Sequence, residues 1–233
     1  EVPLVAFGGL ITKLSEEITS ANVTTLLDRA YNLAMDPRPG AVYLPISPVQ
    51  AISEIDMDDS EIDGIITSTN KSRTIDKKYL NKANDLITAS KKPIVVAGVG
   101  SVASKISGEL LSFIHKINAP ACVTLQAVGN IPCNDKLYLG MYGWFGTPID
   151  EMLKEADLII TVGLDGWDII RPYKSKVPII SIDDADVNDR TFQPVSVGLK
   201  GNMANTLSSL QNLLGERVTD LGWLKKARDC FDK

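Results

Sequence analysis

Residues 92–103, KPIVVAGVGSVA, carry a wholly apolar run that ends abruptly in a glycine-rich turn. The run PIVVA has no polar residue, as is typical of a strand buried on both faces of a parallel sheet. Gly98, Gly100 and Ala103 then satisfy the pattern G-x-G-x-x-A, in which bare amides and a helix N-terminus can approach a diphosphate. An acid at the end of the second strand usually accompanies this pattern, but CVTLQ ends in Gln126. The loop alone therefore leaves two roles open, nucleotide contact or plain packing between strand and helix.

Apolar strands and helical segments alternate on both sides of this turn. The expected helices are 76–90, 103–117, 147–156 and 202–214, and the apolar strand runs are 93–100, 119–126, 157–165, 177–184 and 194–201. Strands without a polar face, separated by helices, indicate a parallel sheet that is covered on both sides. We therefore predict an α/β fold over residues 77–215: a Rossmann-like, doubly wound, mostly parallel six-stranded sheet with helices on both faces.

Residues 1–48 form an N-terminal extension with one predicted helix and one predicted strand. Apolar residues recur at helical spacing from Val23 to Ala34, and Pro37 and Gly40 end the helix before the apolar run AVYLPI. One helix and one strand are too small to fold alone and leave apolar faces that need a partner. We expect this extension to pack on the central domain or on another copy of the chain.

Two polar stretches flank the central domain. Residues 49–76 show no sustained period and many acidic, Ser, Thr and Asn residues, so we predict a linker. The acidic cluster at 56–63 lacks the glycine and terminal glutamate of a calcium loop, and a solvated surface is its expected role. Residues 216–233 are predicted to form a trailing polar helix that carries Trp223 and Phe231.

The composition excludes several classes of protein. The 233 residues are 44% hydrophobic and 23% charged, and the net charge of −5 is spread along the chain without a basic stripe for nucleic acid. No apolar run approaches the roughly 20 residues that cross a bilayer. Three widely spaced cysteines and one histidine, His115, cannot assemble a Cys/His zinc cluster within one chain. We expect a reducing, cytoplasmic location and a structural role for His115.

Two further loops follow strands at the carboxyl edge of the predicted sheet, where open parallel sheets bind their ligands. They are GLDGWD, which begins at residue 163, and SIDDADVN, which begins at residue 181. Acids there can accept hydrogen bonds from adenosine hydroxyls, and nearby cations can neutralise phosphate; helix capping is the alternative role for the acids. The acids are Asp183, Asp184 and Asp186, and the cations are Arg171, Lys174 and Lys200.

Five motifs follow one another at family-like spacing: KPIVVAGVGSV, INAPACVTLQAVGNIPCNDKLYLGMYGWFGTP, EADLIITVGLDGWD, VPIISIDDADVN and PVSVGLKGN. Over residues 80–214 they resemble the central domain of thiamine-diphosphate-dependent enzymes, nearest to acetolactate synthase and with pyruvate oxidase and benzoylformate decarboxylase as further members. Residues 10–50, with a threonine-lysine pair, a helix and an arginine-proline-glycine turn, resemble the end of the family's N-terminal pyrimidine-binding domain.

The resemblance implies an activity for the whole enzyme. Such enzymes use thiamine diphosphate and Mg²⁺ to decarboxylate a 2-keto acid and pass the resulting carbanion to an acceptor. The family's catalytic glutamate lies earlier in the pyrimidine-binding domain, and its magnesium motif lies in the C-terminal domain. We therefore expect no catalytic or metal-binding residue in these 233 residues. The chain begins with Glu, and we expect a scaffold portion of a longer, homo-oligomeric enzyme, with 216–233 leading toward its C-terminal domain.

In this family the central domain holds FAD in acetolactate synthase and pyruvate oxidase, a CoA or ADP group in some relatives, and nothing in many decarboxylases. Three departures argue against tight flavin binding here. Asp165 replaces an arginine that faces phosphate, Phe145 replaces a histidine, and Asn202 replaces an aspartate. We expect an empty or altered nucleotide site. Matched by motif, the implied flavin contacts are Gly98, Val99, Gly100, Thr124, Leu125, Gly143, Gly146, Gly163 and Asp183.

Other interpretations of these motifs are weaker. Leu164-Asp165-Gly166, with Asn188 downstream, imitates the magnesium motif but lacks its leading glycine and lies in the central domain. The alternative function is an FAD-binding module like the alpha subunit of electron-transfer flavoprotein, in which residues 10–50 have no counterpart. A sugar-nucleotide or sirtuin-like enzyme is disfavoured because a catalytic histidine partner and a zinc-binding cysteine set are lacking.

Overall fold

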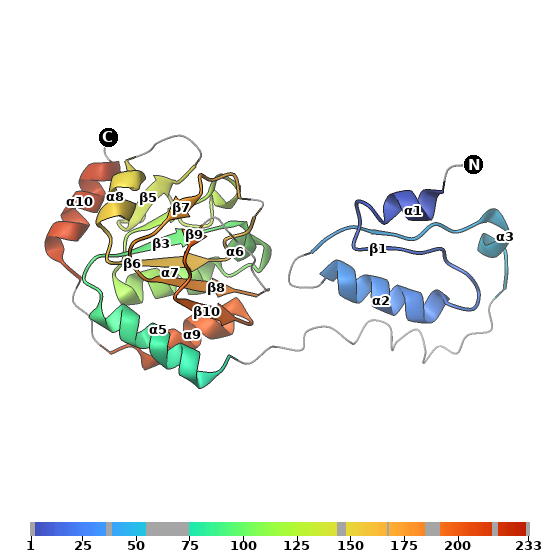
Figure 1. Ribbon diagram of the computed structural model, residues 1–233, viewed down its shortest axis with the longest axis horizontal. Helices are drawn as coiled ribbons and strands as arrows, with labels where there is room; N and C mark the ends of the chain where they lie inside the picture. The colour runs from blue at the N-terminus through green and yellow to red at the C-terminus, as the bar shows by residue number, and fades with distance from the viewer. Residues whose placement is uncertain are drawn as a thin grey trace. The chain divides into compact units, whose positions relative to one another are not determined.

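The computed structural model describes residues 3–35, 39–54, 75–143, 148–166, 168–184, 192–215 and 219–231. The chain divides into two compact units, Glu1–Lys71 and Ser72–Lys233 (Figure 1). The acidic cluster at 56–63 lies outside the described residues. Within the described ranges, no helix has the length and apolar character needed to cross a membrane.

The described residues of the first unit form a two-stranded parallel sheet, one long helix and two short ones. The predicted helix is confirmed as α2, and the predicted strand is confirmed as β2, which pairs in parallel with a short strand that was not predicted. The elements are α1 (Leu4–Gly8), β1 (Leu14–Ser15), α2 (Val23–Met35), β2 (Val42–Tyr43) and α3 (Pro48–Ala51).

Apolar side chains of this unit lie on its surface. Leu26 and Ala30 of α2 are buried, but Leu10, Ile11 and Ile52 are largely exposed. Two short strands and one long helix are too few elements to enclose a hydrophobic core by themselves. The partner that covers the remaining apolar surface stays a prediction.

The second unit contains a six-stranded sheet in the order β10-β8-β6-β3-β4-β5, and every neighbouring pair is parallel. The predicted Rossmann-like sheet is therefore confirmed. In chain order its strands are β3 (Pro93–Ala97), β4 (Ala121–Val123), β5 (Tyr138–Met141), β6 (Leu158–Val162), β8 (Ile179–Asp183) and β10 (Val197–Lys200).

Five of these strands lie within the five predicted apolar runs, whereas β5 was not marked by such a run. All five residues of β3 and of β6 are buried, as expected for central strands with helices on both sides. In β5 only Leu139 is buried, because β5 forms one edge of the sheet. An edge strand needs no continuous apolar run, so its sequence gives a weaker signal.

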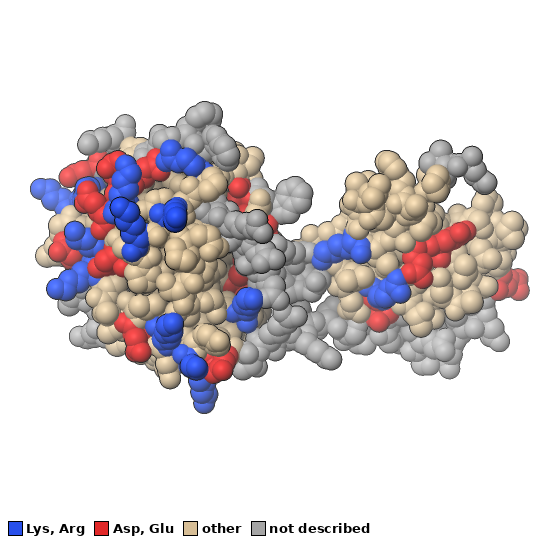
Figure 2. Space-filling view, in the orientation of Figure 1, with Lys and Arg blue, Asp and Glu red and all other residues tan. Residues whose placement is uncertain are grey.

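Helices cover both faces of the sheet (Figure 1). On one face, α5 (Lys77–Ala89), α7 (Ser107–Ile117) and α9 (Met203–Leu213) pack their apolar side chains against alternate strand residues. On the other face, α8 (Ile149–Glu155) and α10 (Leu221–Phe231) pack against the intervening residues. This alternation follows from the two-residue period of a strand. Figure 2 shows acidic and basic side chains intermingled on the visible face of this unit.

Helix α10 is part of this unit rather than an extension beyond it. The Trp223 side chain is only 2% exposed and lies in the core of the second sheet face. Its indole N–H donates a hydrogen bond to the carbonyl oxygen of Pro93 at 2.9 Å. The Thr219 hydroxyl donates to the carbonyl oxygen of Ile117 at 3.2 Å. The expected trailing polar helix is thus anchored by a buried aromatic side chain.

Candidate functional site

The glycine loop lies where the chain direction across the sheet reverses. From β3 the chain proceeds to β4 and β5 on one side, and it then returns to β6, β8 and β10 on the other. Ligands of open α/β sheets bind in the crevice outside the carboxyl ends of the strands at such a switch point. Gly98 follows β3 directly, as the sequence predicted, and it precedes the short helix α6 (Val99–Ala103), which begins before the helix predicted over 103–117.

Close backbone packing at this switch point requires glycine. A Cβ atom added at Gly98 would lie 2.5 Å from the carbonyl oxygen of Gly163, a distance that real Cβ atoms do not show. Gly163 itself has φ +59°, a left-handed conformation that glycine adopts without steric cost. The amide of Gly100 donates a hydrogen bond to the Gly163 carbonyl at 2.8 Å. Gly98, Gly100 and Gly163 are therefore brought together, and they serve the contact between two loops.

A carboxylate that the sequence reasoning missed closes this loop. Asp168 is only 7% exposed and accepts hydrogen bonds from the amide of Val99 at 3.1 Å and from the amide of Asp165 at 2.8 Å. The hydroxyl of Thr124 donates to the same carboxylate. Burial raises the pKa of Asp168, while the hydrogen bonds from Thr124, Asp165 and Val99 oppose that rise. Asp168 is thus a buried acidic group of the chain itself that accepts three hydrogen bonds at the start of α6.

The amide groups of the loop all have acceptors within the chain. Gly98 donates to the carbonyl of Val162 at 2.9 Å, and Ser101 donates to that of Gly98 at 3.1 Å. Val99 and Gly100 donate to Asp168 and Gly163, as described above. A diphosphate cradle needs amide groups that point at the ligand without another acceptor. All four of these amides already have an acceptor in this conformation, so the loop does not fit a flavin diphosphate.

The remaining predicted contact residues are spread along the sheet edge. Thr124 is fully buried, whereas Leu125, at the start of the 3₁₀ turn η1 (Leu125–Ala127), is 49% exposed. Gly143 follows the edge strand β5. Asp183 ends β8, and β3 and β6 separate this strand from β4 and β5 in the sheet. Gly146 and Phe145 lie outside the described residues. The loop contacts described above thus bring Gly98–Gly100, Gly163 and Thr124 together, whereas Asp183 ends another strand.

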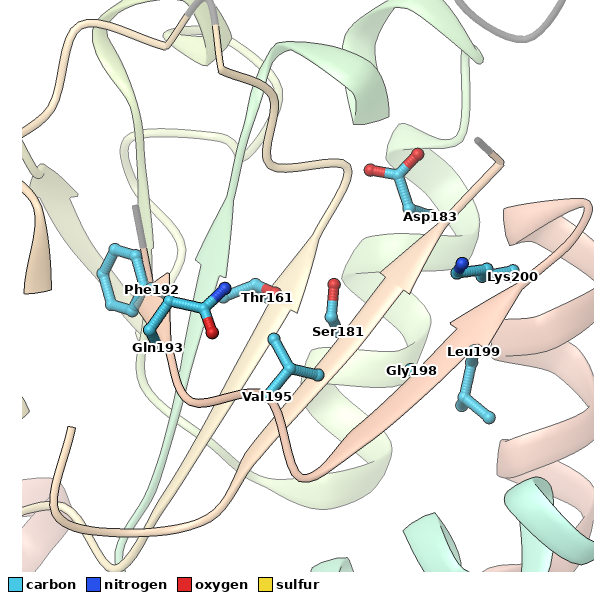
Figure 3. A pocket seen from close by; sticks show the side chains of 9 residues that line it. All are labelled: Thr161, Ser181, Asp183, Phe192, Gln193, Val195, Gly198, Leu199 and Lys200. Atoms are coloured by element: carbon cyan, nitrogen blue, oxygen red, sulfur yellow. The ribbon is translucent and has the colours of Figure 1, made fainter. Parts of the chain in front are cut away.

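Asp183 instead lines a pocket of about 220 Å³ on the face of the sheet that α8 and α10 cover elsewhere (Figure 3). Strands β6, β8 and β10 form its floor, and the segment from β9 (Phe192–Gln193) to β10 forms its wall. β9 is held by parallel pairing with β7 (Tyr173–Lys174). The lining residues are Thr161, Ser181, Asp183, Phe192, Gln193, Val195, Gly198, Leu199 and Lys200.

Neither the magnesium-like motif nor the histidine belongs to a cluster of metal-ligating side chains among the described residues. The amide of Asp165 is bonded to Asp168, and Asn188 lies outside those residues. Within the described ranges, no group of three or more His, Cys, Asp and Glu side chains lies close enough to hold a metal ion. His115 Nε2 lies 2.7 Å from Asp135 Oδ2, at the surface.

Comparison with known proteins places this fold in one family. Residues 80–210 match the family described as thiamine pyrophosphate enzyme, central domain. The acetolactate synthase large subunit of Haemophilus influenzae is 28% identical, over 95% of this chain and 41% of its own length. The corresponding subunit of Lactococcus lactis is 28% identical, over 97% of this chain and 40% of its own length.

A solved structure from Mycobacterium smegmatis, assigned to the thiamin diphosphate-dependent enzymes, has the same fold. Its TM-score is 0.68 at 21% identity, and the match covers 88% of this chain and 40% of that one. The chain therefore spans about two fifths of the length of the relatives it matches. Because the family match covers more than half of its residues, the chain belongs to the thiamine pyrophosphate enzymes, and residues 80–210 are their central domain.

Proposed function

We propose that this chain is a non-catalytic scaffold portion of an acetolactate-synthase-like enzyme, which decarboxylates a 2-keto acid and transfers the resulting carbanion to an acceptor. The names of the two relatives described above support the acetolactate synthase assignment. The scaffold role is supported by the share of those relatives that the chain spans, about two fifths of their length. Thiamine diphosphate supplies the carbanion chemistry in this family, and we place its site, together with Mg²⁺, on the domains that complete the enzyme.

The Asp168 carboxylate at the glycine loop is the observation that carries the scaffold role. An α/β domain binds its ligand at the switch point, and here the amide of Val99 at that point is bonded to the chain's own Asp168. An internal carboxylate that accepts three hydrogen bonds stabilises the loop without any ligand. We therefore assign the loop to packing between β3, α6 and β6.

A flavin-binding role is not proposed, because no contact of the described residues favours it. Asp165 is an acid at the position where the resemblance implies an arginine that faces phosphate, and the loop amides already have acceptors. The same two observations argue against a module of the electron-transfer flavoprotein type. An FAD titration of the purified chain, followed by flavin fluorescence, is expected to give no saturable quenching.

We propose the remaining domains of the parent enzyme as partners, within a homo-oligomer. The exposed apolar side chains of the first unit, which include Leu10, Ile11 and Ile52, support a protein partner for that unit. We also propose a reducing, cytoplasmic location, because among the described residues neither Cys122 nor Cys133 forms a disulfide bond.

The activity is tested by expressing the coding sequence of this chain with its flanking coding sequence. We expect the longer protein to convert pyruvate into acetolactate and carbon dioxide when thiamine diphosphate and Mg²⁺ are supplied. The 233-residue chain alone is expected to be inactive in the same colorimetric assay. Acetolactate formation by the chain alone would overturn the scaffold role. A longer protein that decarboxylates no 2-keto acid would overturn the proposed activity.

A further inference from the structure

We draw no further inference here: the strongest candidate, the surface patch of exposed apolar side chains that Leu125, Val128 and Ile169 place around the turn η1 at the carboxyl edge of the six-stranded sheet, carries no proposal because no contact among the described residues shows what covers it.

Discussion

The carboxylate of Asp168 accepts a hydrogen bond from the backbone amide of Val99, with Oδ1 lying 3.1 Å from the amide nitrogen and 69 residues separating the two in sequence. The bond joins the loop after β6 to the first residue of α6, across the switch point of the sheet. It places a negative charge where the partial positive charge of the α6 N-terminus lies. The glycine loop is thereby held in a closed, internally bonded form.

Removal of this carboxylate is expected to destabilise the second unit. Asp168→Ala leaves the buried hydroxyl of Thr124 and the partly buried amides of Val99 and Asp165 without their acceptor. We expect the free energy of unfolding to fall by about 2–4 kcal/mol, as measured by urea denaturation. Asp85→Ala on the exposed side of α5 is the control and should change stability by less than about 0.5 kcal/mol. Equal losses in the two variants would contradict the role assigned to Asp168.

Glycine substitutions should distinguish a position with close backbone contacts from a position with open space around it. Gly98→Ala places a methyl group against the Gly163 carbonyl, and we expect a loss of about 2 kcal/mol or more of unfolding free energy. Gly108→Ala, at an exposed position of α7, should instead gain about 0.5–1 kcal/mol because alanine is the better helix former. Thermal unfolding followed by circular dichroism checks both. The account of the loop fails if Gly98→Ala is as stable as Gly108→Ala.

The anchoring of α10 is tested by Trp223→Phe. The change removes the indole hydrogen bond to Pro93 and part of a buried ring, so we expect a loss of about 1–3 kcal/mol in urea denaturation. Leu221→Ala, at the exposed start of the same helix, should have little effect. If the two variants behave alike, Trp223 does not hold α10 on the domain.

The surface pair of Asp135 and His115 predicts a small pH dependence of stability. Burial raises the pKa of Asp135, but hydrogen bonds from the Leu137 amide and His115 outweigh it and leave the pKa below its ordinary value of 3.8. A lowered acid pKa contributes stability above the unfolded-state value, and this contribution is lost as pH falls through the folded-state value. Asp135→Asn should therefore cost up to about 1 kcal/mol at pH 7.

The difference between wild type and Asp135→Asn should shrink as the pH is lowered below about 4. Urea denaturation of both proteins at several pH values measures it. A difference that stays constant down to acid pH would show that the ionised carboxylate does not contribute. Glu109→Gln, on the same helix as His115, serves as the control for a general charge effect.

Much of the central domain follows from local sequence patterns. Apolar runs predicted β3, β4, β6, β8 and β10, because a central strand of a parallel sheet is buried on both faces and needs an apolar residue at each position. The glycine turn after β3 was likewise recognisable, because only a few residue types permit close approach between strand and helix. Periodicity also predicted α2 in the first unit.

Long-range contacts were beyond the reach of these patterns. No local signal pairs Asp168 with Val99 and Thr124, and none places Trp223 against Pro93, 130 residues away. The pocket is likewise built from β6, β8, β10 and the segment after β9, which only the strand order brings together. The sequence by itself therefore determined the elements and the parallel α/β sheet, since these depend on local periodicity and backbone preference. The tertiary structure alone decided which polar groups meet, because those contacts depend on how distant segments pack.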